Sequence, residues 1–128
     1  MASSYTTLLG LVLPVTGELT NTWGSAVNSS LTQLVEDAIA GSQSQSVTSA
    51  DWTLTTTAGG VSNEARLAIL IATGAPGVTR YIYAPQLSKM YVVVNNCSDS
   101  SLVYISGGTS SSHTTGVSIA AGSSALVA

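Results

Sequence analysis

The sequence predicts a mainly β protein with one N-terminal α-helix, and three observations lead to this fold class. Apolar residues recur at helical spacing only between Asn21 and Gly41. From Asp51 onward, short β-branched and apolar runs are separated by Gly, Asn, Asp, Ser and Pro, as in strands joined by turns. The first residues contain Pro14, which prevents one continuous helix there. We therefore expect three parts in order: an extended arm over 1–20, a helix over about 21–40, and a β-sandwich or jelly-roll-like domain over 51–128.

The helix is predicted by an apolar stripe and by residues suited to both of its ends. Asn21 or Thr22 is a suitable N-cap, because a short side-chain oxygen accepts from the first free backbone N–H groups. Gly41 is expected to adopt the left-handed conformation that ends many helices. The stripe consists of Trp23, Val27, Leu31, Leu34, Val35, Ala38 and Ile39.

Seven short strands are predicted after the helix, and their spacing is typical of a sandwich or a jelly roll. Both faces of the run over 66–72 are largely apolar, so this strand is expected to lie centrally in its sheet. The polar stretch over 42–50 is interpreted as a linker. The chain stops within a predicted strand, and we expect the sandwich to continue beyond Ala128. The expected strands cover 52–57, 66–72, 80–85, 89–96, 102–106, 117–120 and 124–128.

Charged residues are scarce in this chain, and this scarcity argues against two classes of partner. Only 7% of the 128 residues are charged, and the formal net charge is -3. Such a chain has no basic patch for nucleic acid or for an anionic membrane surface. No apolar run approaches the roughly 20 residues that cross a bilayer. We therefore expect neither a nucleic acid nor a membrane as partner.

The chain has few residues of the types that commonly carry out catalysis. His113 is the only histidine and Cys97 the only cysteine, and they are too isolated to predict a nucleophile–base pair or a zinc site. Glu36 and Asp37 are adjacent on the helix and therefore point in different directions. We expect no enzymatic activity, no metal site and no cofactor.

Assembly is the role that the helix favours. Val27, Leu31, Leu34 and Ala38 follow the four-three-four spacing of a coiled-coil seam, although for barely two heptads. The alternative, that this stripe packs on the chain's own sandwich, stays open. Trp23 has the area to anchor a contact between subunits, and Asn28 has the polar side chain that fixes register. The predicted oligomerisation residues are Trp23, Val27, Asn28, Leu31, Leu34, Val35 and Ala38.

Two segments carry a family resemblance. The first is LGLVLPVTGELTNTWGSAVNSSLTQLVEDAIAG, with Trp23-Gly24 and Val27-Asn28 before an acidic-apolar helix. The second is PQLSKMYVVVNNCSDSSLVYI, followed by a Gly- and Thr-rich loop and TGVSIAAGSSALV. Together they resemble the N-terminal region of tail-fibre-type virion structural proteins of bacteriophages, cyanophages among them, and the β module that follows it.

The resemblance implies a homotrimer in the tail of the virion that supports host adsorption. Its N-terminal portion would attach to other virion proteins of the tail, baseplate or connector. A host surface glycan would be contacted through a more distal part. The resemblance supplies no catalytic residues, and its match at Trp23, Gly24, Val27 and Asn28 supports an assembly role for the helix.

Two other functions fit the same sequence. A capsid decoration protein would share the trimer and the sandwich but would bind the capsid lattice. A carbohydrate-binding module would use tyrosines as glycan or surface contacts, and tyrosines exposed in one row on a sheet face would favour it. The candidate tyrosines are Tyr81, Tyr83, Tyr91 and Tyr104.

Overall fold

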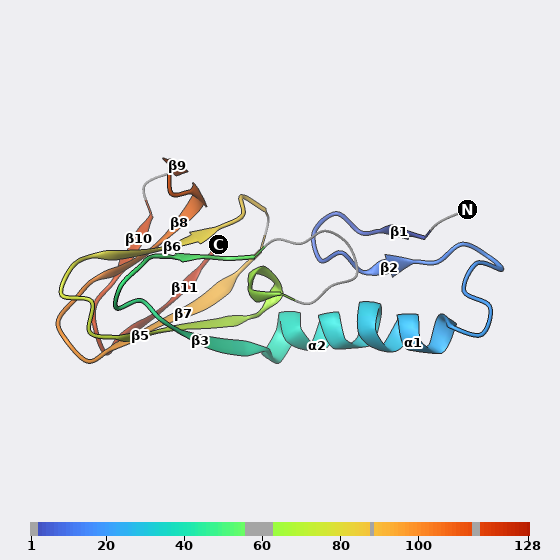
Figure 1. The fold of residues 1–128 in the computed structure, drawn as a ribbon, viewed down its shortest axis with the longest axis horizontal. Coiled ribbons are helices and arrows are strands. Elements are labelled where there is room, and N and C mark those ends of the chain that lie inside the picture. Colours follow the sequence, from blue (N-terminus) through green and yellow to red (C-terminus); the bar gives the residue numbers. More distant parts are fainter. Residues whose placement is uncertain (1–2, 56–62, 88, 114–115) are drawn as a thin grey trace.

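The computed structural model describes residues 3–55, 63–87, 89–113 and 116–128. The molecule is elongated, with a β-sandwich at one end and with a helix and a β-hairpin side by side at the other (Figure 1). Among the described residues, 38% lie in strands and one helix of 18 residues is present. The predicted fold class, mainly β with one N-terminal helix, is therefore confirmed.

The N-terminal arm is folded back on itself rather than extended. β1 (Ser4–Tyr5) and β2 (Val12–Leu13) pair antiparallel. Their turn is closed by hydrogen bonds from the Thr6 amide to the Leu11 carbonyl (2.9 Å) and from the Gly10 amide to the Thr6 carbonyl (3.0 Å). Sequence analysis missed the hairpin because its strands have only two residues each.

The helix spans Trp23–Ala40 in three stretches. α1 (Trp23–Val27) is followed by a π-helical stretch over Asn28–Thr32 and then by α2 (Gln33–Ala40). A π turn contains one residue more than an α turn. Apolar residues before and after it are therefore rotated about the helix axis relative to one another and no longer form one straight stripe. The seam predicted by the four-three-four spacing is therefore interrupted at its middle.

Both predicted helix ends differ from expectation. Thr22 is the N-cap but makes no side-chain capping hydrogen bond, and Asn21 has a φ of 66°. Gly41 is not left-handed, because its φ of -68° and ψ of 141° carry the chain directly into a strand. A Cβ at Gly41 would lie 2.6 Å from the Asp37 carbonyl oxygen and 2.7 Å from Leu67 Cδ2. Close packing, not handedness, requires the glycine.

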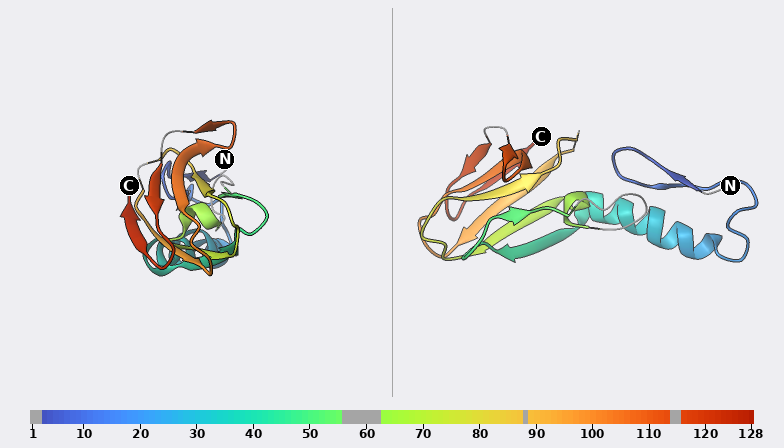
Figure 2. Two further views of the ribbon diagram at one scale, coloured as in Figure 1. Left: turned by 90° about the vertical axis from the view of Figure 1, so that its left-hand side faces the viewer. Right: turned by 45° about the horizontal axis from the view of Figure 1, so that its top comes forward.

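The sandwich consists of two sheets, visible end-on and obliquely in Figure 2. The four-stranded sheet has the order β11-β7-β5-β3, and the five-stranded sheet has the order β10-β8-β6-β4 with β9 paired to β8. The first comprises β3 (Ser42–Ser46), β5 (Ile69–Gly74), β7 (Tyr91–Cys97) and β11 (Ser124–Val127). The second comprises β4 (Trp52–Thr53), β6 (Arg80–Ala84), β8 (Val103–Thr109), β9 (Ser112–His113) and β10 (Val117–Ile119).

From β3 to β8 the chain alternates between the two sheets. Strands next to each other within a sheet are therefore parallel, as in β3-β5-β7 and β4-β6-β8. Among the described strands of the two sandwich sheets, the antiparallel pairs are the outer ones, β11-β7, β10-β8 and β8-β9. The structure is thus a sandwich without the predominantly antiparallel pairing of a jelly roll, and β5 lies centrally as predicted.

The prediction of a polar linker over 42–50 is wrong for the first half of that segment. Residues Ser42–Ser46 form β3 and pair parallel with β5, from Ser42 opposite Ile69 to Ser46 opposite Thr73. Their side chains lack the apolar alternation that reveals a strand, because β3 is an edge strand held by backbone hydrogen bonds. The helix is therefore joined to the sandwich without a spacer.

The seven predicted strands each have a counterpart, with boundaries shifted by a few residues. The segment over 66–72 begins as a short 3-10 helix, Glu64–Arg66, before β5. The end of the run predicted over 52–57 lies outside the described residues. The core between the sheets includes Val47, Trp52, Leu70, Ile82, Val93, Val103, Ile105 and Ile119.

Asn95 is a fully buried polar residue at the edge of this core. Its Nδ2 donates to the carbonyls of Ser101 (2.9 Å) and Ile119 (2.8 Å), and its Oδ1 accepts from the Cys97 amide (3.2 Å). Asn95 therefore links β7 to the start of β8 and the end of β10.

Candidate functional site

The arm, the helix and the sandwich meet at one segment, residues 65–68, which we call the joint. The amide of Ala68 donates to the carbonyls of Asp37 (3.1 Å) and Gly41 (3.0 Å), at the end of the helix. Its carbonyl accepts from the Val92 amide (2.8 Å) of β7. The joint thus fixes the helix to the four-stranded sheet.

Arg66 connects the joint to the arm. Its Nη1 donates to the carbonyl oxygen of Leu9, in the turn of the hairpin, and its side chain is 9% exposed. Gly10 follows Leu9 with a φ of 67°, and a Cβ there would lie 2.7 Å from the guanidinium nitrogens. A buried cation needs hydrogen-bonding partners, and the turn supplies one of them. Sequence analysis did not identify this contact.

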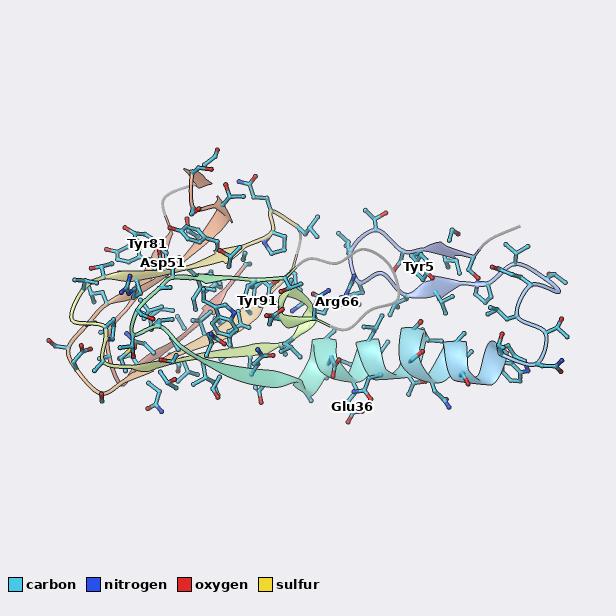
Figure 3. The ribbon with its side chains drawn as sticks, in the orientation of Figure 1. Tyr5, Glu36, Asp51, Arg66, Tyr81 and Tyr91 are labelled. Atoms are coloured by element: carbon cyan, nitrogen blue, oxygen red, sulfur yellow. The ribbon has the colours of Figure 1, made fainter. Side chains whose placement is uncertain are left out.

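Lys89 and Tyr91 hold the joint from the sandwich side. The Tyr91 hydroxyl donates to the Ala65 carbonyl (2.6 Å), and Lys89 Nζ donates to the Leu67 carbonyl (2.6 Å). The ammonium also lies 4.1 Å from the centroid of the Tyr91 ring. Figure 3 shows Tyr91 and Arg66 at the end of the sandwich that faces the arm.

Burial shifts the pKa values of Tyr91 and Lys89 in the directions that favour the neutral form of each side chain. It raises the pKa of Tyr91 to about 12, although the nearby Arg66 charge opposes this shift. It lowers the pKa of Lys89 to about 8. A cavity of about 250 Å³ lies beside them, lined by Pro85, Lys89, Tyr91 and Val127 among others.

Three of the four candidate tyrosines gather on the outer face of the five-stranded sheet. Tyr81 lies directly opposite Tyr104 in the β6-β8 register, with ring centroids 5.5 Å apart. The rings of Tyr81 and Tyr83 stack with centroids 5.9 Å apart and planes within 6°. Tyr83, Tyr81 and Tyr104 therefore form a row of tyrosines. The ring of Tyr81, in the middle of the row, stacks against the rings of both neighbours.

Asp51 organises one end of this row. Its carboxylate accepts from the Tyr81 amide (3.0 Å) and from the Tyr83 hydroxyl (3.2 Å). Figure 3 shows Asp51 beside Tyr81. Burial and the Asp51 charge raise the pKa of Tyr83. Sequence analysis did not assign a role to Asp51.

Two of the tyrosines predicted as surface contacts are buried. Tyr83 is 4% exposed and Tyr91 is 5% exposed. Tyr91 lies on β7 with Val93 on the inner side of the other sheet, so it does not join the row. Period-two alternation places each strand residue inside or outside, and in β7 the tyrosine falls inside.

The structure separates the predicted oligomerisation residues by exposure. Leu34 is fully buried within a single chain, whereas Trp23 is 65% exposed. Asn28 is also exposed, and Val27, Leu31, Val35 and Ala38 are half-buried. Ile39, at the other end of the stripe, is 75% exposed. Part of the stripe therefore packs on its own chain, and its two ends are accessible to another molecule.

Cys97 is a buried free thiol, and burial together with the Asp99 charge raises its pKa. Within 3–55, 63–87, 89–113 and 116–128, no three His, Cys, Asp or Glu side chains gather as metal ligands. In the same residues, no helix is long and apolar enough to cross a membrane.

Comparisons of the chain with protein-family models, with curated proteins and with solved structures found no match.

Proposed function

We propose that this chain is a bacteriophage virion structural protein of the tail-fibre type. Its N-terminal region attaches the fibre to the tail and forms a homotrimer, and the assembled fibre supports host adsorption. The proposal starts from the sequence resemblance, whose two segments together cover most of the chain.

One structural observation carries the proposal furthest. The helix and the hairpin extend from one end of the sandwich and are fixed to it by Arg66 and by the backbone of the joint (Figure 1). In the proposed fibre, the end with the helix and the hairpin would be the attachment end of this elongated molecule, and the sandwich would be its distal end. The exposed ring of Trp23 lies at the attachment end, where a large aromatic side chain suits a protein contact.

Labelling of intact virions tests this function. Antibody against the chain, viewed by electron microscopy, is expected to mark the tail. A regular label over the capsid would instead support a decoration protein, and absence of the chain from purified virions would reject both. Native mass spectrometry is expected to give three times the chain's 12.9 kDa.

A carbohydrate-binding module is the second candidate, and the tyrosine row is the observation that favours it. Tyr104 stands at one end of the row, stacked on Tyr81 on one side and half-buried. A sugar that stacks on Tyr104 would therefore contact the other face of the Tyr104 ring. Titration with a panel of glycans tests this function: binding that Tyr104→Ala abolishes would support it, and no binding by the intact chain would reject it.

A further inference from the structure

The outer face of the four-stranded sheet is apolar, although it is covered by none of the described elements. Parallel pairing places Ile69 opposite Val92 and Ile71 opposite Val94. Leu126 of β11 lies beside Val92 and is 69% exposed. Since Leu70, Ala72 and Val93 point into the core, the residues between them point outward. Five aliphatic side chains therefore form one patch, which we call the aliphatic face: Ile69, Ile71, Val92, Val94 and Leu126.

Figures 1 and 2 show why this face is open. The helix and the hairpin extend the molecule lengthwise and do not lie over the sheet. An outer sheet face in contact with water normally carries polar side chains. The aliphatic face departs from that pattern on two neighbouring strands and on the edge strand β11.

The aliphatic face is bordered by small polar residues and carries no charge. Ser42 and Ser44 of β3 flank Ile69 and Ile71, while Ser124 of β11 flanks Val94. No charged residue occurs in β3, β5, β7 or β11. An apolar centre with a neutral polar rim is the composition of a protein interface.

We propose that the aliphatic face packs against a second copy of this chain, so that the sheet as well as the helix joins the subunits. This inference rests on the proposed fibre-type assembly and adds a surface to it. Contact between two such faces brings no like charges together, whereas an unrelated partner is usually selected by complementary charges, which this face lacks.

The size of the face also favours a partner that continues along the helix. Four strands about 4.8 Å apart and five residues long, at about 3.3 Å each, cover roughly 300 Å². A stable interface needs about 800 Å² from each partner. The remainder must come from elements next to the sheet. Ile39 is 75% exposed and lies three residues before Ser42, where the helix enters β3. A second copy aligned along the same axis supplies a matching sheet and helix.

Substitution of Ile71 tests the proposal. Ile71 is half-buried in the middle of the face, and the long side chain of Ile71→Lys can extend its ammonium into water in a single chain but not in the assembly, where it is buried. We expect folded protein with native circular dichroism and at least about a hundredfold weaker association, measured by analytical ultracentrifugation, since burying an unpaired charge is costly. The control is Thr73→Lys, on the same face but in its polar row, opposite Asn96; its association is expected to stay close to that of the unchanged chain.

Two outcomes would overturn the inference. One is an unchanged dissociation constant for Ile71→Lys, and the other is a monomeric unchanged chain. A photo-crosslinking amino acid in place of Val94 adds an independent readout: a link to another copy supports the inference, and a link only to a different virion protein refutes it. Virion labelling reports separately on the proposed function, so tail labelling with intact Ile71→Lys oligomers would remove this inference alone.

Discussion

Arg66 donates a hydrogen bond to the carbonyl oxygen of Leu9, 57 residues earlier in the chain, and so ties the arm to the sandwich. The contact requires the backbone of the hairpin turn to come very close to the guanidinium. Gly10 permits this approach, since it has neither a Cβ nor a preference for negative φ.

Gly10→Ala is therefore expected to loosen the arm. The left-handed backbone alone costs an alanine about 1 kcal/mol, and its Cβ would lie 2.7 Å from the guanidinium nitrogens. Hydrogen exchange is expected to speed up at the Gly10 and Leu11 amides, which close the turn. Gly17→Ala is the matched control, because Gly17 has a φ of 83° but no atom within 4 Å of the added Cβ. Equal effects of the two substitutions on arm exchange would show that contact with Arg66 is unimportant.

Asn95→Ala is expected to destabilise the sandwich strongly. The substitution removes three hydrogen bonds and leaves the Ser101 and Ile119 carbonyls and the Cys97 amide without this partner. The expected loss in the free energy of unfolding is about 3 kcal/mol, measured by urea denaturation. The neighbouring Asn96 is exposed, so Asn96→Ala is expected to change stability by less than about 0.5 kcal/mol. Similar losses for both variants would contradict the structural role of Asn95.

Much of the sandwich follows from local patterns, whereas the contacts between its parts do not. β5, β6 and β7 were predictable because short runs of β-branched, aliphatic and aromatic residues bounded by turn residues are typical of strands. β3 was not, because SQSQS has no apolar residue and is held by the backbone of β5. Parallel pairing between strands separated by a crossover leaves no local signal either.

The candidate site was harder to predict for the same reason. Arg66 stands beside an apolar run, and its partner Leu9 belongs to a hairpin whose short strands have no recognisable period. Tyr91 and Tyr81 look alike in sequence, yet the register of β7 turns Tyr91 inward while β6 turns Tyr81 outward. Sequence identifies a tyrosine in a strand; the face it occupies depends on how that strand enters the sandwich.

Lys89 is expected to titrate well below an ordinary lysine. It is the only lysine of the chain, so the NMR signal of its ε-methylene group can be followed without overlap from other lysines. Burial lowers its pKa to about 8, from 10.5 in the unfolded chain. Between these values the folded state has released a proton that the unfolded state still binds, so stability should rise with pH from about 8 to 10.5. Lys89→Met should lack this rise in stability. An NMR titration midpoint near pH 10.5 for Lys89 in the folded protein would refute the prediction.

Tyr91 is expected to act in the opposite direction at higher pH. Its pKa of about 12 in the folded state lies above the unfolded value of 10.0. Above pH 10 the unfolded chain loses the phenolic proton while the folded chain keeps it, so stability should fall between pH 10 and 12. Denaturant unfolding at pH 9, 10 and 11 measures the slope. Tyr91→Phe should be less stable at pH 7, because it loses the hydrogen bond to Ala65, and should show a shallower alkaline decline. An unchanged decline would assign it to other groups.

The helix stripe is best tested at its exposed ends. Leu34 is fully buried in one chain, so Leu34→Asp is expected to damage the fold of the monomer whether or not the copies associate. Loss of oligomer in that variant would therefore not identify an interface.

Trp23→Ser and Ile39→Ser separate assembly from folding, because the two side chains are 65% and 75% exposed. If these residues contact a second copy, each variant should keep its helical circular dichroism and its unfolding midpoint but associate more weakly, since removing a buried aromatic or aliphatic contact typically costs an interface about 1 kcal/mol or more. Thr32→Ser, at an exposed polar position of the same helix, provides a conservative control. Light scattering that reports the native mass for both variants at every concentration would exclude the helix ends from the interface and leave the aliphatic face as the remaining candidate.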